Sequence, residues 1–294
     1  MKNKVLILTD STVDLPEDIV KKRDITVVPL YIHLGDQELR DGIDINTDQM
    51  YEWIEKNKIL PSTAAVSPHF FGELIKKYLD QGYDVFYCGI GMKLSGTGRN
   101  FLLAAQEFPQ DRVFFLDSQN LSSGIAITVL KAADLRDKGY SAKEIHEKLK
   151  DLPSRILSQF VIKTLDYMRK GGRATGMQAL LGAALRIRPV LRVRDGVLSL
   201  YKKAMGKLSR GMDIQIDEFL QEYDNGNIVP DYVFITHTQS SKMYEYTVQR
   251  LEEHGVKIKN LIEGQAGCVI SSHCGPGTIG ILYEVKDINK VINK

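Results

Sequence analysis

The stretch DVFYCGIGMKLSGTGRNFLLAAQEF, residues 84–108, decides the fold class, because it joins a buried strand to a helix through a glycine-rich turn. DVFYCGIG is a short apolar run typical of a buried strand, and a helix opens with SGTGRNFLLAAQEF. KVLILTD (4–10) is also typical of a buried strand, SPHFFGELIKKYLDQGY (67–83) of a helix, and RVFFLDSQNLSSGIAITVLKAADLRDKGY (112–140) of a strand, a loop and a helix in turn. This alternation, up to about residue 155, predicts a parallel α/β sheet.

The chain after Pro153 has a different pattern and predicts a second domain. Several strand-like runs follow one another there, and RDG at 194–196 is a hairpin turn signal between two of them. With helices at about 207–223 and 240–254, this pattern predicts an α+β domain with a mixed or antiparallel sheet. A chain of 294 residues usually forms two domains. We place them at residues 1–155 and 156–294, packed closely because no low-complexity linker separates them.

Composition and charge exclude several functional classes. The hydrophobic content of 43% and charged content of 26% are ordinary for a soluble globular protein, and the net charge of +2 does not suggest nucleic-acid binding. The three cysteines form neither an even framework nor a CxxC motif, which suits a reducing cytosol. Neither a signal peptide nor a membrane-spanning run is recognisable, so we expect a cytoplasmic protein.

One segment, residues 155–210, is strongly basic. It carries 13 Lys and Arg against two acids, Asp166 and Asp195. Such a segment either meets phosphate, an acidic partner or an anionic lipid surface, or is simply a solvated face.

The glycine-rich turn GIGMKLSGTGR, residues 89–99, does not match the known phosphate loops. Leu94 stands where G-x-G-x-x-G needs glycine, and Thr97 stands where the P-loop needs lysine. Ser95 is not within G-x-S-x-G, so a hydrolase nucleophile elbow is not supported. Ser95 beside a helix N-terminus is either a weak anion site or only a helix N-cap.

Three further polar residues stand out near small residues. Thr63 lies in a short loop before a helix, Arg173 follows Gly171-Gly172, and His273 precedes Gly275-Pro276-Gly277. Each has a structural explanation as an ordinary turn or helix-end residue. The spacing of His273 to Cys268 and Cys274 matches no standard zinc site, so we expect no metal.

Taken together, these short motifs resemble the DegV family of bacterial fatty-acid-binding proteins, which includes the acyl-carrying subunit of fatty acid kinase. The resemblance runs almost end to end. It is carried by Asp10-Ser11-Thr12, Thr63, Ser95-Gly96-Thr97, Asp117-Ser118 with Gly124, Lys170-Gly171-Gly172-Arg173, and His273 with Gly275-Pro276-Gly277.

The resemblance implies a long-chain fatty acid bound at the interface of the two domains, with no other cofactor. It implies that Thr63, Ser95 and His273 bind the carboxylate. The supporting loops would contain Ser11, Gly96, Thr97, Gly275 and Gly277, whose glycines let backbone amides come close. It assigns Arg173 and Lys203 to an acyl phosphate or to the docking of a kinase. The segment MQALLGAALRI, residues 177–187, is our candidate for part of an apolar tunnel wall.

The chain departs from the family pattern at several positions. Ala64 replaces a frequent serine, Val66 a frequent proline, and Gly91-Met92 a frequent serine pair. Met205 occupies the usual position of an arginine after Lys203. Lys202, Lys203 and Lys207 compensate for that arginine in charge but not in bidentate geometry.

We therefore expect a non-catalytic, monomeric lipid carrier that presents a fatty-acid carboxylate to a separate kinase in phospholipid metabolism. Its basic segment allows transient contact with a membrane surface. Two alternatives remain open. One is an acyl transferase or hydrolase that uses Ser95 with His273, and the other is a carrier without a kinase partner, which Met205 favours.

Overall fold

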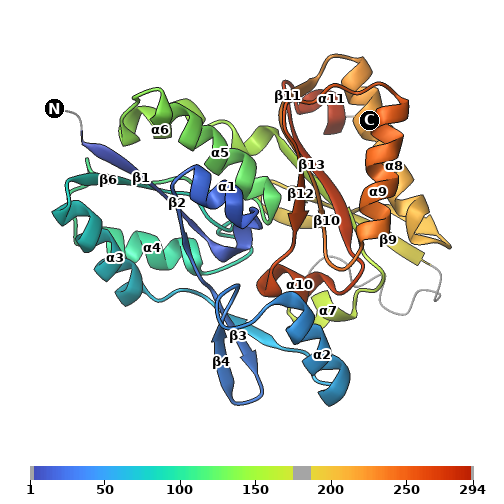
Figure 1. Cartoon of the computed structure of the whole chain (residues 1–294), viewed down its shortest axis with the longest axis horizontal. Helices are drawn as coiled ribbons and strands as arrows, with labels where there is room; N and C mark the ends of the chain where they lie inside the picture. The colour runs from blue at the N-terminus through green and yellow to red at the C-terminus, as the bar shows by residue number, and fades with distance from the viewer. Residues whose placement is uncertain (1–2, 175–186, 293–294) are drawn as a thin grey trace.

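The computed structural model describes residues 3–174 and 187–292 and shows two lobes side by side (Figure 1). We call residues 3–155 the N-terminal lobe and residues 156–292 the C-terminal lobe. The predicted tunnel segment, residues 177–187, lies outside the described residues except for Ile187.

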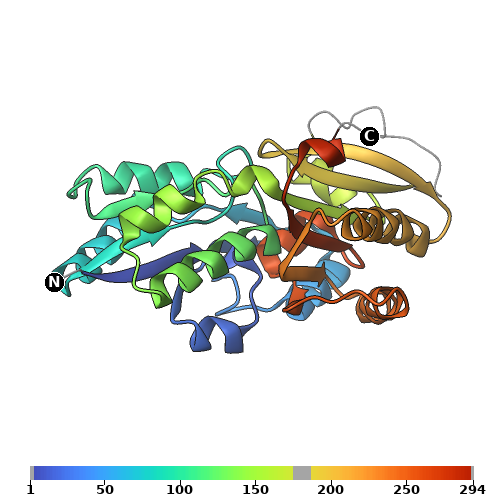
Figure 2. The ribbon, with the colours of Figure 1, turned by 90° about the horizontal axis from the view of Figure 1, so that it is seen from above.

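The N-terminal lobe is built on a parallel sheet in the order β2-β1-β6-β7, which confirms the predicted α/β pattern. Helices α3 and α4 cover one face of the sheet and α5 and α6 the other (Figures 1 and 2). The elements are β1 (Lys4–Asp10), β2 (Ile25–Val28), β6 (Tyr83–Tyr87), β7 (Val113–Phe115), α1 (Glu17–Lys22), α3 (Pro68–Asp80), α4 (Thr97–Ala105), α5 (Ser123–Asp137) and α6 (Ala142–Leu149). Ser67 caps α3 through the Phe70 N–H, and Pro68 is its first residue.

The C-terminal lobe contains a six-stranded sheet in the order β10-β9-β8-β13-β11-β12. Strands β11 and β12 pair in parallel and the other neighbours pair antiparallel, so the predicted mixed sheet is confirmed. The predicted hairpin turn falls at Asp195 and Gly196, both with positive φ. The elements are β8 (Ile156–Val161), β9 (Ile187–Arg194), β10 (Val197–Met205), β11 (Ile228–His237), β12 (Leu261–Gln265), β13 (Ile279–Val285), α7 (Asp166–Lys170), α8 (Leu208–Asp224), α9 (Ser241–Glu253), α10 (Cys268–Cys274) and α11 (Asn289–Ile292).

A small three-stranded sheet, β4-β3-β5, was not predicted. Pro29 interrupts the apolar run ITVVPLYIHL, residues 25–34, and its second half leaves the parallel sheet and becomes β3 (Tyr31–Leu34). It pairs with β4 (Gln37–Arg40) and β5 (Ser62–Ala64), so Thr63 lies in a strand rather than in a loop. Helix α2 (Thr47–Asn57) follows β4, and its N-cap is Asn46.

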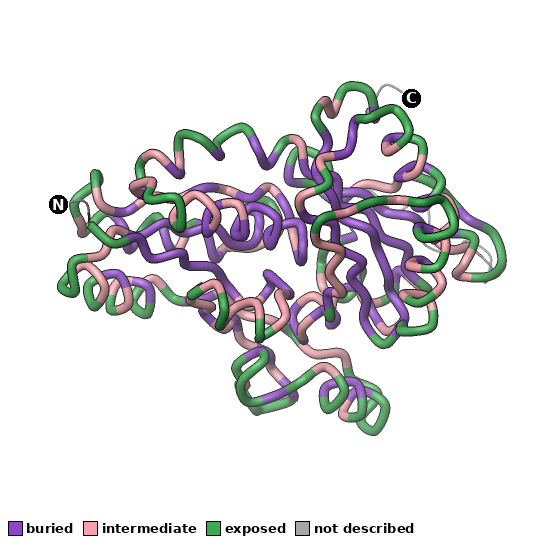
Figure 3. The backbone as a smooth tube through the Cα atoms, turned by 45° about the horizontal axis from the view of Figure 1, so that its top comes forward, coloured by how far each residue is buried: buried purple, intermediate pink, exposed green. Residues whose placement is uncertain are grey.

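The two lobes share a continuous core. Helix α5 is buried on most sides because it packs against β1 of one sheet and against β8, β11 and β13 of the other. In Figure 3, buried segments of the two lobes meet at their junction. Glu284 on β13, with 3% of its side chain exposed, pairs with Lys131 (2.5 Å) and Arg155 (3.0 Å) of the N-terminal lobe.

Helix α10 belongs to the C-terminal lobe but is held by carboxylates of the N-terminal lobe. Asp14 Oδ1 accepts the Gly267 N–H (2.8 Å), and Asp41 Oδ1 accepts the Cys268 N–H (2.8 Å). Both acceptors satisfy amides that the first turn of a helix leaves unpaired. The position of α10, and of His273 near its last residue, is therefore set by the opposite lobe.

Candidate functional site

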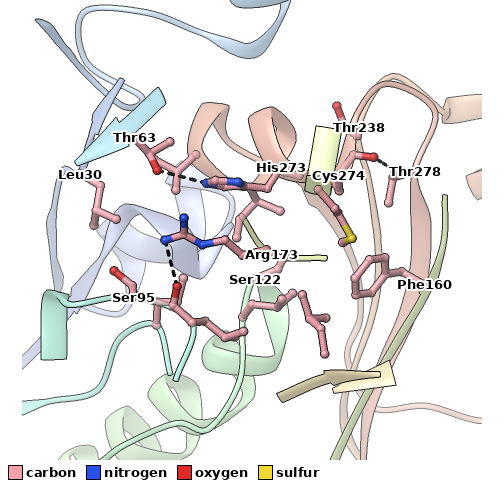
Figure 4. Close-up of a pocket in the computed structure, with 18 of the residues that line it drawn as sticks. Leu30, Thr63, Ser95, Ser122, Phe160, Arg173, Thr238, His273, Cys274 and Thr278 are labelled. Atoms are coloured by element: carbon pink, nitrogen blue, oxygen red, sulfur yellow. Dashed lines mark hydrogen bonds between the residues drawn. The ribbon is translucent and has the colours of Figure 1, made fainter. Parts of the chain in front are cut away.

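A cavity lies between the two lobes, with about 1000 Å³ of empty space that is partly open to solvent (Figure 4). Its N-terminal-lobe wall comes from the loops that follow β6 and β7, at the carboxyl edge of the parallel sheet, where ligands of α/β proteins commonly bind. Most of the lining is apolar and includes Leu30, Ile90, Leu94, Leu121, Phe160 and Leu198. A mostly apolar lining of this kind suits the apolar part of an organic ligand.

Two buried or half-buried aspartates fix the loop after β6. Asp10 Oδ2 accepts hydrogen bonds from the Tyr87 hydroxyl (2.8 Å) and the Ile90 N–H (2.9 Å). Asp117 Oδ1 accepts the Met92 N–H (3.1 Å). Gly91 suits this tight loop, because a Cβ there would lie 3.0 Å from the Asn120 backbone nitrogen. The motifs at the ends of β1 and β7 therefore hold the loop that carries Ser95.

Ser95 lines the cavity just before helix α4. The N-cap residue of α4 is Gly96, so Ser95 is not the cap that the simpler interpretation required. Its Oγ accepts the Thr97 N–H (3.2 Å) and lies 2.9 Å from Thr97 Oγ1. These contacts hold the hydroxyl at the cavity wall.

Thr63 and His273, which are 210 positions apart in the chain, meet at the cavity (Figure 4). Thr63 Oγ1 lies 3.1 Å from His273 Nε2. His273 Nδ1 is buried against Gly171 and has no hydrogen-bond partner among the described residues. A buried N–H without a partner is costly, so we assign the ring proton to Nε2. His273 then donates to Thr63, whose own hydroxyl hydrogen remains available to a ligand.

The electrostatics of this end of the cavity depend on Arg173 rather than on His273. Burial, together with the nearby Arg173 guanidinium, lowers the pKa of His273 to about 4. His273 is therefore neutral at pH 7. The positive charge that faces the cavity is that of Arg173.

Arg173 spans the two lobes at the mouth of the cavity. Its guanidinium donates to the carbonyl oxygens of Gly171 (2.6 Å) and Leu94 (3.3 Å). It lines both the cavity and an adjoining cleft that also contains Lys93 and Arg99. The family resemblance assigns Arg173 to an acyl phosphate or to the docking of a kinase, and the glycine pair before it is a local sign of a close approach.

The other predicted supporting residues lie around the site rather than in it. Ser11 Oγ accepts the Leu30 N–H and donates to Asp41, and Thr97 is buried beneath Ser95. The amides of Gly275 and Gly277 donate to the Ser271 and Thr238 carbonyls. We expected these amides to be free to bind a ligand, and they are not. Of the predicted glycines, Gly96 lines the cavity. Lys203 is exposed on β10 and does not line it.

Sequence reasoning missed Ser122, which also lines the cavity. Its backbone has φ 52° and ψ −142°, an unusual conformation for a residue with a side chain, and its Oγ donates to Asp14. A serine pair before a helix gives no sequence signal for such a role.

The described residues contain no group of three or more His, Cys, Asp or Glu side chains placed to hold a metal ion. Within residues 3–174 and 187–292, no helix combines the length and apolar content needed to cross a membrane.

Comparison with known proteins identifies the family. A family model described as "Uncharacterised protein, DegV family" matches residues 4–286. A DegV domain-containing protein of Clostridium perfringens is 30% identical over 285 residues, covering 96% of this chain and 98% of that protein. A Thermus thermophilus DegV structure described as fatty acid binding is 30% identical, with a TM-score of 0.86 over 97% of this chain and 100% of that one. A Thermotoga maritima structure described as a DegV lipid-binding protein is 27% identical, with a TM-score of 0.81 over 97% and 99% of the two chains. The chain therefore belongs to the DegV family.

Proposed function

We propose that this protein binds a long-chain fatty acid in the cavity between its lobes. The observation that carries the proposal is the Thr63–His273 contact at one polar end of a mostly apolar cavity. The fatty-acid and lipid binding described for the Thermus and Thermotoga relatives supports it. Thr63, Ser95 and Arg173 would face the carboxylate, and His273 would hold the Thr63 hydroxyl in a donating orientation.

The acyl chain would supply most of the affinity. Burying the methylenes of a 16-carbon chain is worth roughly 12 kcal/mol before ordering costs, at ~0.8 kcal/mol for each CH₂. Hydrogen bonds to the charged carboxylate give ~1.5–3 kcal/mol each, set against a desolvation cost of several kcal/mol. The polar end therefore provides orientation and discrimination rather than the bulk of the binding energy.

The geometry favours a carrier over a serine-dependent acyl transferase or hydrolase. Such an enzyme needs the nucleophile hydrogen-bonded to a base that a third group orients. Among the described residues, the Ser95 hydroxyl bonds to Thr97 and His273 Nε2 bonds to Thr63. His273 Nδ1 has no orienting partner there, and a histidine with a pKa of about 4 is a weak base at pH 7.

The test is to extract the purified protein with organic solvent and to analyse both fractions by mass spectrometry. We expect a free long-chain acid in the extract and unmodified protein. A covalent acyl adduct on a serine or threonine would instead support the enzyme. Binding of acetate as tightly as a long-chain acid would contradict the apolar cavity as the binding site.

We further propose that the bound carboxylate is presented to a separate fatty acid kinase by a cytoplasmic, monomeric carrier, with Arg173 and Lys203 on the docking side. Met205, which is 56% exposed on β10, stands at the usual arginine position. Met205→Arg should therefore raise phosphorylation of the bound acid in a coupled kinase assay without changing its affinity. Equal phosphorylation with both proteins would show that position 205 does not matter to the kinase, and no phosphorylation with either protein would favour a carrier that works without a kinase.

A further inference from the structure

The cavity has a second polar boundary, distant from Thr63 and Ser95. His237, Thr238 and Ala266 line both the cavity and a separate cleft of about 930 Å³ whose walls include Asn46, Asp48 and Gln265. The basic cleft beside Arg173 shares none of its described lining residues with this second cleft. In Figure 4, Thr63, Ser95 and Arg173 lie on one side of the cavity and Thr238 on the other. His237, Thr238 and Ala266 therefore separate the cavity from this cleft.

Helix α10 gives the direction of the cavity. Val269, Ile270 and His273 line it from one face of the helix, and Ala266 lines it just before the helix begins. The five positions from Cys268 to His273 within the helix correspond to about 7.5 Å at 1.5 Å per residue, and Ala266 lies two residues before Cys268. The Ala266 N–H donates to the His237 carbonyl (2.9 Å), which places His237 at the end opposite His273.

His237 is locked in place and presents carbon to the cavity. Its side chain is 3% exposed, and its Nε2 lies 2.8 Å from Glu263 Oε1. Its Nδ1 accepts the Ser240 N–H (3.2 Å), so the neutral ring donates from Nε2 to Glu263. Neither Glu263 nor Ser240 lines the cavity. Because both ring nitrogens bond to groups outside the cavity lining, only the carbon atoms of the ring can face an apolar ligand.

We propose that His237 is the end wall for the methyl end of the acyl chain and sets the longest fatty acid that the cavity accepts. The inference rests on the proposed function, because it concerns the same cavity. Removing the outer part of the ring would join the cavity to the polar cleft and make room for longer chains. Adding bulk at Ala266 would shorten the cavity from the other side of the same wall.

The experiment compares the affinities of wild type and variants for saturated acids of increasing length, by displacement of a fluorescent fatty acid. His237→Asn keeps an oxygen that can accept the Ser240 N–H while it removes the outer ring. Each newly buried CH₂ should tighten binding about fourfold, so acids two carbons beyond the wild-type optimum should gain roughly 15-fold relative to wild type. Ala266→Leu should shift the optimum to shorter acids.

His33→Asn is the matched control, since His33 also faces a glutamate, Glu38, but lies on β3 outside the cavity lining. Its chain-length profile should equal that of wild type. If His237→Asn and Ala266→Leu both keep the chain-length profile of wild type, His237 is not the end wall, and the proposed function is unaffected. If His237→Asn does not fold, an unshifted Ala266→Leu profile alone overturns the end wall. Failure of wild type to bind any long-chain acid would overturn the proposed function itself.

Discussion

Replacing Gly171 by alanine tests whether the close approach of α7 to His273 sets the geometry of the site. A Cβ at Gly171 would lie 2.2 Å from His273 Nδ1 and 2.8 Å from its Cε1. Gly171 has φ −73°, so alanine adopts this backbone without strain, and the change is purely steric. The imidazole must retreat by about 1 Å to restore an ordinary contact.

That displacement is large enough to break the Thr63–His273 hydrogen bond, which is 3.1 Å long. Overpacking of this kind costs about 1–3 kcal/mol in the free energy of unfolding. Losing the hydrogen bond leaves the Thr63 hydroxyl unoriented, and we expect fatty-acid affinity to fall about tenfold. In a His273→Ala background the clash partner is absent, so the stability cost of Gly171→Ala should fall to nearly zero.

The assay is a double-mutant cycle on Gly171 and His273, with denaturant unfolding and fatty-acid titration for each protein. Gly72→Ala, in helix α3, is the control, because no heavy atom lies within 4 Å of its added Cβ. It should match or slightly exceed wild type in stability. An equal cost of Gly171→Ala in both backgrounds, or no cost at all, would refute the steric coupling.

Three further outcomes follow from the same site. First, the pKa of His273 is lowered to about 4 from 6.5, so the folded protein binds fewer protons than the unfolded chain between these pH values. Its stability contribution is complete above pH 6.5, and about 2 kcal/mol is lost between pH 7.5 and 5, a loss that His273→Gln should not show in denaturant unfolding. Second, Thr63→Val and His273→Ala should reduce affinity non-additively in titration, and strictly additive losses would show that they do not share a carboxylate. Third, Arg173→Ala should weaken binding of the acid about tenfold and spare the fatty alcohol, whereas Lys203→Ala should change neither; equal weakening of acid and alcohol would remove Arg173 from the carboxylate site.

The local part of the fold could be predicted because each signal acts within a few residues. Ser67 and Pro68 start α3, and Asp195-Gly196 turns the β9–β10 hairpin, through backbone preferences that neighbouring residues do not override. The β4-β3-β5 sheet could not be predicted in this way. Its strands are short, and β5 pairs with β3 from about 30 residues away, so only tertiary contacts specify it.

The site was predictable as a set of residues but not as a geometry. The family resemblance pointed to Thr63, Ser95 and His273, and the structure brings Thr63 and His273 into contact. Their role toward a carboxylate remains a prediction. Nothing local shows that His273 is neutral, because its low pKa depends on burial by distant segments, or that Arg173 lines the cavity, because its contact with the Leu94 carbonyl joins distant segments.

The contacts of Glu284 and α10 with the N-terminal lobe also limit which C-terminal lobes of relatives can replace this one. A chimera that joins this N-terminal lobe to the C-terminal lobe of a relative must keep a carboxylate opposite Lys131 and Arg155, and amides opposite Asp14 and Asp41. Glu284 is 3% exposed, but Lys131 is 19% and Arg155 40% exposed, so we expect the loss of its carboxylate to cost less than the about 3–5 kcal/mol of a fully buried pair, against a typical total stability of about 5–15 kcal/mol. The two lobes are therefore expected to be inherited together, and gene shuffling at their junction should yield few folded proteins.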